Sequence, residues 1–140
     1  MPAFKHKTPV HIRFKDLDAL GHVNNANHAT YIETARVAYF DEVIGTEIDW
    51  EKSGLILARL EIDYRQPILF RDKISVYTAC THIGTKSFDL SHRLVKEENG
   101  TETEVAAARS VVVAFSYAEQ KTVQVPAAWA EKMHVYDAVQ

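Results

Sequence analysis

The chain has 140 residues, a formal net charge of −3 at pH 7 and 46% hydrophobic residues. This length suits a single domain with a sizeable core, and the mild acidity excludes a general binder of nucleic acid or anionic membranes, which would need clustered lysine and arginine. No stretch reaches the ~18 apolar residues of a membrane span, no apolar secretory signal is present, and the single cysteine cannot form an internal disulfide. We therefore expect a cytoplasmic protein in which Cys80 is a buried apolar residue.

The first part of the chain predicts one strand followed by one long helix. Apolar and polar residues alternate from His6 to Phe14, which is typical of a strand with one apolar face. From Asn25 to Ile44 apolar residues recur at spacings of three and four, with no glycine or proline inside. Asn24 or Asn25 is suited to cap the start of this helix, and Gly45 stands where a C-terminal cap belongs.

The rest of the chain predicts strands. In the strand that ends at Tyr64, every second residue is apolar, so Ile56, Ala58, Leu60, Ile62 and Tyr64 are expected to share the inner face. Three more strands and a short outer helix follow, and we expect them at Lys73–Ile83, Ser87–Lys96, Thr103–Tyr117 and Ala127–Met133.

The last two strands are joined by the strongest hairpin signal in the sequence. Asn99-Gly100 lies between alternating segments, and this pair readily adopts the positive φ angles of a type I′ turn. One long helix with antiparallel strands gives an α+β domain whose sheet curves around the helix. The strand Thr103–Tyr117 is apolar on both faces near its end, which predicts that a second subunit covers part of the sheet in a homodimer.

The most informative segment is Asp16–Asn25, DLDALGHVNN, which connects the first strand to the helix. A helix start offers unpaired N–H groups and a partial positive charge, which suit a carbonyl oxygen that becomes an oxyanion. An aspartate beside it can attack the carbonyl carbon or activate water. The residues alone also allow a structural interpretation, in which Asp18 only closes an Asx turn before the helix.

This segment resembles the signature of the hotdog-fold acyl-CoA thioesterases of the 4-hydroxybenzoyl-CoA thioesterase family. Its pattern is Asp16-x-Asp18-x-x-Gly21-His22-Val23-Asn24-Asn25, and two later segments are also similar to the family, Tyr31–Arg36 (YIETAR) and Asp63–Pro67 (DYRQP). The order of the predicted elements matches the family along roughly the whole chain. The resemblance therefore implies a hotdog fold, in which a curved antiparallel sheet wraps a long central helix.

The resemblance also implies a mechanism. Asp18 would be the catalytic carboxylate, either as nucleophile or as general base, and the backbone amide of Asn25 would polarise the thioester carbonyl. Candidate substrate-binding residues are Gly21, His22, Val23, His28 and Arg65. His28 departs from the pattern, because the family usually has tyrosine at that position; it is a packing residue, a pocket wall or an acid/base group.

Other polar residues have structural interpretations. Asp16 is expected to form a turn or to be solvated, and Glu33 and Arg36, three apart on the helix, to form an ordinary surface pair. The histidines and carboxylates near the motif match no familiar metal-ligand spacing, so we predict neither a metal nor a cofactor.

The expected partner is an acyl-CoA or acyl carrier protein thioester, bound by a homodimer or homotetramer. Basic residues at strand ends and turns are weak candidates for phosphate contacts: Arg65, Arg71, Lys86, Arg93 and Lys96. Two other functions stay open. One is a hotdog hydratase or dehydratase, which would need a different acid/base pair, and the other is a non-catalytic module that binds an acyl ligand. The length and chemistry of the acyl group are not predicted, because pocket depth is expected to depend on a subunit interface.

Overall fold

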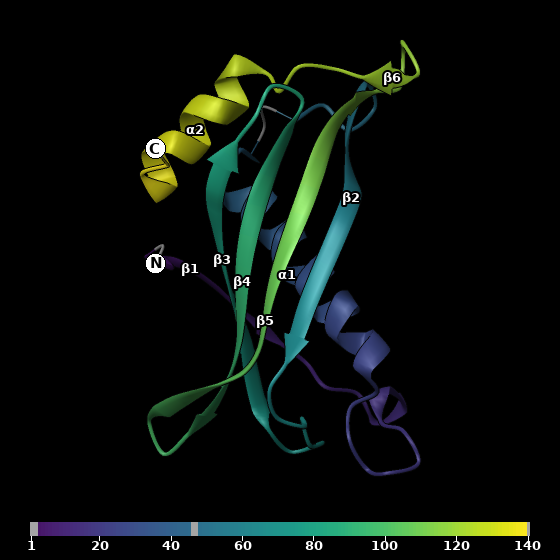
Figure 1. Ribbon diagram of the computed structural model, residues 1–140, viewed down its shortest axis with the longest axis vertical. Coiled ribbons are helices and arrows are strands. Elements are labelled where there is room, and N and C mark those ends of the chain that lie inside the picture. Colours follow the sequence, from purple (N-terminus) through teal and green to yellow (C-terminus); the bar gives the residue numbers. More distant parts are fainter. Residues whose placement is uncertain (1–2, 46–47, 140) are drawn as a thin grey trace.

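A computed structural model describes residues 3–45 and 48–139. Figure 1 shows a curved antiparallel sheet with one long helix, α1, on one face and a shorter helix, α2, beside one end. The elements in chain order are β1 (His6–Val10), a 3₁₀ turn η1 (Phe14–Asp16), α1 (Asn25–Val43), β2 (Ser53–Tyr64), β3 (Lys73–Ile83), β4 (Ser87–Glu98), β5 (Thr101–Ser116), β6 (Lys121–Thr122) and α2 (Ala127–Asp137).

The strands lie in the order β1-β3-β4-β5-β2, with β6 paired to the end of β5, and all pairs are antiparallel. The strand β2 follows the helix in the chain but pairs with the last long strand, so it forms one edge of the sheet. The opposite edge is β1, where Pro9 is tolerated because an edge strand has one side without ladder hydrogen bonds. Asn99 and Gly100 have φ angles of 53° and 79°, which confirms the predicted hairpin turn between β4 and β5.

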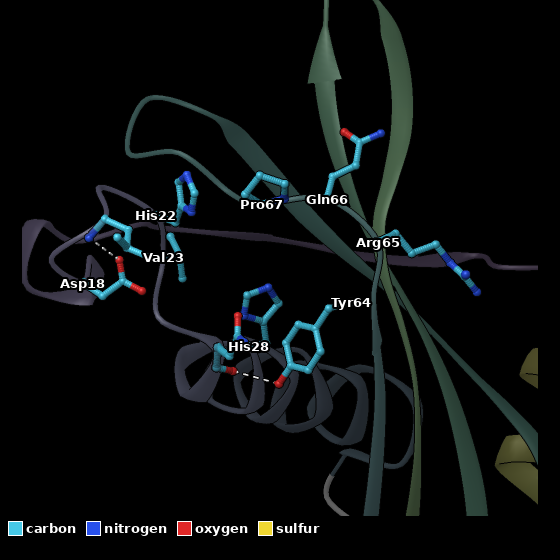
Figure 2. A pocket seen from close by; sticks show the side chains of 10 residues that line it. Asp18, His22, Val23, His28, Tyr64, Arg65, Gln66 and Pro67 are labelled. Carbon is cyan, nitrogen blue, oxygen red and sulfur yellow. Dashed lines mark hydrogen bonds between the residues drawn. The ribbon is translucent and has the colours of Figure 1, made fainter.

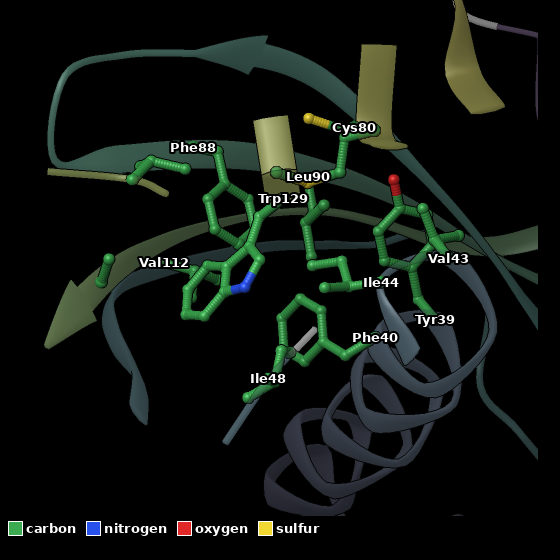
Figure 3. Close-up of a cluster of buried hydrophobic side chains, with 13 residues drawn as sticks. Tyr39, Phe40, Val43, Ile44, Ile48, Cys80, Phe88, Leu90, Val112 and Trp129 are labelled. Carbon is green, nitrogen blue, oxygen red and sulfur yellow. The ribbon is translucent and has the colours of Figure 1, made fainter. Parts of the chain in front are cut away.

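The long helix begins and ends close to the predicted positions. The side chain of Asn24 accepts a hydrogen bond of 2.9 Å from the N–H of Ala26, and Gly45, at φ 63°, follows the last turn. One side of α1 supplies Tyr39, Phe40 and other buried side chains to a core cluster (Figure 3). Helix α2 is longer than predicted and is more than an outer cover, because its Trp129 is buried in this cluster.

The first strand is shorter than predicted. It ends at Val10, and the chain then turns through η1, which leaves Phe14 78% exposed instead of on an apolar strand face. The prediction for Cys80 is confirmed, because the residue is buried in the main core cluster and burial raises the pKa of its thiol to about 12.

A β-bulge corrects the predicted inner face of β2. Leu57 pairs with Val112 and Arg59 with Val111, so Ala58 is the extra residue in the ladder. Residues directly opposite each other share a face, and Val112 is buried in the core. By this register Leu57 takes the inner position expected for Ile56, although at this sheet edge it is still 39% exposed. The prediction for the half of the strand after the bulge holds, since Leu60 and Ile62 pack against the core.

A polar row crosses the buried face of the sheet beneath α1. The ring of His92 hydrogen-bonds with Thr78 Oγ1 at 3.1 Å and with Ser110 Oγ at 2.7 Å, and all three residues are buried. Arg36 is 7% exposed and its Nη1 has no hydrogen-bond partner among the described residues, although Nη2 lies 3.8 Å from the exposed Glu33. The expected surface pair is therefore wrong for Arg36, because the helix turns this side chain toward the sheet.

Among the described residues, no helix is long and apolar enough to cross a membrane.

Candidate active site

The loop between β1 and α1 is anchored by Asp16. This residue is 1% exposed, and its carboxylate accepts hydrogen bonds from the Arg13 N–H at 3.0 Å and from Tyr31 Oη at 2.8 Å. Burial opposes the charge, but these bonds outweigh it and hold the pKa of Asp16 below its ordinary value. The structural role predicted for Asp16 is confirmed, whereas the expectation of a solvated carboxylate is wrong.

Backbone bonds from Asp16 connect this anchor to the start of α1. Its carbonyl oxygen accepts from the N–H of Asn24 and from the side-chain amide of Asn27, both at 2.8 Å. The intervening residues therefore form a closed loop that returns the chain to the first turn of the helix.

Asp18 lies at the tip of this loop. Its Oδ1 accepts a 2.9 Å hydrogen bond from the N–H of Leu20, which forms the Asx turn that the sequence allowed. Among residues 3–45 and 48–139, its Oδ2 accepts no hydrogen bond, and this oxygen points toward the neighbouring cavity (Figure 2). Gly21 closes the turn at φ 82°, with its N–H donating to the Asp18 carbonyl at 3.1 Å. The positive φ angle of this turn explains why glycine occupies the position. Gly21, which we expected to bind substrate, is not among the residues that line the cavity.

A second loop, which follows β2, lies against the first. The N–H of Val23 donates to the carbonyl of Ile68 at 2.8 Å, and His22 forms a β-bridge with Leu69. These contacts join two segments that are far apart in the chain.

A cavity of about 340 Å³ lies between the two loops and the start of α1 (Figure 2). The first loop and the helix contribute the lining residues Asp18, Leu20, His22, Val23, Asn25 and His28. The end of β2 and the loop after it contribute Tyr64, Arg65, Gln66 and Pro67. The sequence therefore predicted most of one wall, but only one residue of the other.

The backbone amide of Asn25 donates no hydrogen bond to any residue that the structure describes. Asn25 is the first residue of α1, so its N–H has no partner within the helix, and the side chain of Asn24 caps the next amide instead. The carbonyl of Asn25 accepts a 3.0 Å hydrogen bond from Tyr64 Oη, which ties the helix start to the end of β2. Asp18 and Asn25 thus line the same cavity, and Asn25 is the first residue of α1.

His28 forms the inner wall, one helical turn beyond Asn25. It is 2% exposed, and its ring contacts the ring of Tyr64 edge to face with 4.8 Å between centroids. Burial lowers the pKa of His28, while the backbone carbonyls of Asn24 and Asn25 oppose this shift. The ring is therefore a neutral imidazole at physiological pH.

Arg65 reaches the cavity only with part of its side chain. Its guanidinium donates to Glu104 at 3.0 Å and extends away from Asp18 (Figure 2). Arg93 donates to the same carboxylate at 2.8 Å, so two of the candidate phosphate contacts already share an ion-pair partner.

Four lining residues were not predicted as site residues: Leu20, Tyr64, Gln66 and Pro67. Tyr64 is the one that hydrogen-bonds the helix start. It stands in the segment Asp63–Pro67, which was matched to the family, and alternation placed it on the inner face of its strand. Those two signals together could have identified it.

Among the described residues, no group of three or more histidine, cysteine or acidic side chains is arranged to hold a metal.

A family model described as the thioesterase-like superfamily matches residues 12–133 of this chain. Among solved structures, a thioesterase from Thermus thermophilus, complexed with coenzyme A and zinc, is 30% identical; the alignment covers 100% of this chain and 99% of that one, with a TM-score of 0.85. A mutant 4-hydroxybenzoyl-CoA thioesterase, complexed with 4-hydroxybenzoyl-CoA, is 20% identical; the alignment covers 91% of this chain and 96% of that one, with a TM-score of 0.82. At that identity the likeness shows the fold alone.

Among curated proteins, the uncharacterised protein YsmA of Bacillus subtilis (strain 168) is 23% identical over 90 residues. These residues are 64% of this chain and 60% of YsmA, so the match spans less than two thirds of that relative.

Proposed function

This chain belongs to the thioesterase-like superfamily, and from that premise we propose that it hydrolyses an acyl-CoA thioester to a free acid and coenzyme A. One observation carries the proposal: Asp18 and Asn25 line the same cavity. Among the described residues, one oxygen of the Asp18 carboxylate accepts no hydrogen bond, and the backbone amide of Asn25 has no partner within the helix. The 30% identical thioesterase is a complex with coenzyme A, which supports CoA as the carrier. The finer assignment to the 4-hydroxybenzoyl-CoA thioesterase family is part of the proposal and rests on the motif at Asp16–Asn25.

In the proposed mechanism the thioester carbonyl oxygen accepts a hydrogen bond from the N–H of Asn25. Negative charge that develops on this oxygen is stabilised by the amide and by the partial positive charge at the start of α1. Loss of one such donor costs about 3–4 kcal/mol in other enzymes. The position of the amide is maintained by the Asn24 cap and by the Tyr64 hydrogen bond to the carbonyl of Asn25.

Asp18 supplies the second part of the chemistry by one of two routes. As a nucleophile, Oδ2 attacks the carbonyl carbon, the C–S bond breaks to release thiolate, and water then cleaves the mixed anhydride. As a general base, the carboxylate takes a proton from water, whose oxygen attacks the carbonyl carbon directly. Thiolate is a good leaving group in both routes, so no strong acid is needed beside the sulfur.

The remaining candidates have supporting roles in this proposal. His22, Val23 and His28 form the wall against the acyl group, Gly21 allows the turn that presents Asp18, and Arg65 contacts the carrier from the rim of the cavity. An acyl carrier protein is the alternative carrier.

We also propose that the chain acts in the cytoplasm as a homodimer. The edge strand β2 has exposed apolar residues on both faces, with Ile56 41% and Leu57 39% exposed. Exposed apolar edge strands are sites of strand pairing or subunit contact. If β2 is the subunit contact, Ile56→Lys shifts the protein from dimer to monomer in light scattering coupled to gel filtration. An unchanged mass would place the contact elsewhere.

The decisive test of the activity is a panel of acyl-CoA and acyl carrier protein thioesters, with free thiol as the readout. Asp18→Asn is nearly isosteric and is expected to abolish thiol release with an unchanged melting temperature. Near wild-type hydrolysis in this variant would exclude Asp18 as the catalytic group. Hydration of an enoyl-CoA without thiol release would favour the hydratase alternative, and binding without any reaction would favour the acyl-binding module.

A further inference from the structure

The wall of the cavity contains a buried polar side chain without a partner. His28 is 2% exposed, and its Nδ1 has no hydrogen-bond partner of normal geometry among the described residues. A buried polar atom without a partner costs about 1–3 kcal/mol, and the interaction of the ring with the backbone of Asn24 and Asn25 offsets part of this cost at Nδ1. No described residue bonds the other ring nitrogen, Nε2, either.

The orientation of the ring distinguishes the two nitrogens. Nδ1 is next to the stem of the side chain and faces the preceding helical turn, where the carbonyls of Asn24 and Asn25 favour a proton on the ring. Nε2 is at the far edge of the ring, which rises from α1 toward the side of the cavity lined by Val23 and Pro67 (Figure 2). A neutral imidazole with its proton on Nδ1 presents Nε2 as a hydrogen-bond acceptor.

His28 lies one helical turn away from the proposed position of the reacting carbonyl. His28 is three residues after Asn25, on the same helix face and about 4.5 Å further along the axis. An acyl group whose carbonyl oxygen is held by the Asn25 amide therefore passes His28 with its first carbons after the carbonyl. The edge-to-face contact with Tyr64 limits rotation of the ring away from this position.

We propose that His28 is a specificity-determining residue whose Nε2 accepts a hydrogen bond from a hydroxyl group on the second or third carbon of the acyl chain. The substrate class is then a short hydroxyacyl thioester, in preference to the matching alkanoyl thioester. This inference rests on the proposed function for the location of the carbonyl, but it concerns only the acyl group.

The test compares kcat/KM for 3-hydroxybutyryl-CoA and butyryl-CoA. The expected ratio is about tenfold in favour of the hydroxyacyl substrate, as for one well-formed hydrogen bond in a buried site. His28→Phe keeps a ring of similar shape without the acceptor, and it is expected to bring the ratio close to one. His28→Gln restores an acceptor and should recover part of the preference. His11→Phe makes the same change at an exposed histidine and should leave the ratio unchanged.

A binding measurement separates this inference from the proposed function. Titration calorimetry of the Asp18→Asn variant with the two CoA thioesters reports the preference without turnover. Hydrolysis with no preference, or a preference that survives in His28→Phe, would overturn the role of His28 and leave the thioesterase proposal intact. A preference in binding with no hydrolysis by the native chain would support His28 and contradict the thioesterase proposal.

Discussion

Replacement of Asp16 by alanine tests whether this buried carboxylate holds the loop of the candidate site. The carboxylate accepts bonds from the Arg13 N–H at 3.0 Å, from Arg13 Nη2 at 3.2 Å and from Tyr31 Oη at 2.8 Å. Tyr31 is 4% exposed, so the substitution leaves a buried hydroxyl without its acceptor. We expect the loop to lose its anchor and the whole domain to lose stability.

The magnitude follows from the two bonds that are well shielded. A hydrogen bond to a charged group contributes about 1.5–3 kcal/mol, so the bonds from the Arg13 N–H and from Tyr31 Oη together give about 3–6 kcal/mol. The side chain of Arg13 is 50% exposed, and its ion pair adds little because water screens it. A loss of this size is a large fraction of the stability of a small domain.

Urea unfolding of four proteins measures the effect: the native chain, Asp16→Ala, Tyr31→Phe and the double variant. We expect a coupling energy of about 1–2 kcal/mol between the two positions, because each removes one partner of the same bond. Asp18→Asn, two residues away, is the matched control and should change the free energy of unfolding by less than about 0.5 kcal/mol. A loss below about 1 kcal/mol in Asp16→Ala, or additive single effects, would refute this account of the loop.

The same carboxylate gives a pH dependence with a defined sign. Because the pKa of Asp16 is lower in the folded than in the unfolded chain, its contribution to stability is complete above about pH 4 and is lost as the pH falls further. The native chain should therefore lose more stability than Asp16→Ala on acidification below about pH 4.

Two other substitutions test the sheet. Burial lowers the pKa of His92 to about 3 in the folded chain, whereas the ordinary value in an unfolded chain is about 6.5. The neutral ring therefore makes its full contribution to the free energy of unfolding above about pH 6.5, and this contribution is lost as the pH falls. Between about pH 6.5 and 3 the native chain should lose about 1.4 kcal/mol per pH unit relative to His92→Leu, as measured by urea unfolding. Parallel pH profiles would contradict a neutral His92 between Thr78 and Ser110. Gly100→Ala should cost about 1 kcal/mol in thermal unfolding because φ is 79°, whereas Asn99→Gly should be nearly neutral; equal effects would argue against the type I′ turn.

Local features of the sequence predicted the elements that depend on near neighbours. Helix α1 begins at Asn25 as predicted and ends at Val43, one residue early, because capping and periodicity act within a few residues. The hairpin at Asn99-Gly100 was predictable for the same reason. The hotdog-like fold implied by the motif at Asp16–Asn25 is supported by the superfamily match and by the 30% identical thioesterase.

Features that depend on distant contacts were not predictable. The bulge at Ala58 arises from the pairing of β2 with β5, and it reverses the inner face for half of the strand. Asp16 and Arg36 are ordinary polar residues in the sequence, yet both are buried by segments that fold over them. A burial pattern of this kind depends on the whole packing arrangement, which no local period encodes.

The sequence by itself predicted most of the residues in one wall of the candidate site. It placed Asp18 in the turn before the helix and the Asn25 amide at the helix start, because a turn and a helix cap are specified by neighbouring residues. The tertiary structure alone decided that the end of β2 supplies the facing wall, with Tyr64 bonded to the helix start and His28 enclosed between them. The two walls are joined by backbone contacts between loops that are distant in the chain, and such contacts form only when the sheet and helix pack together.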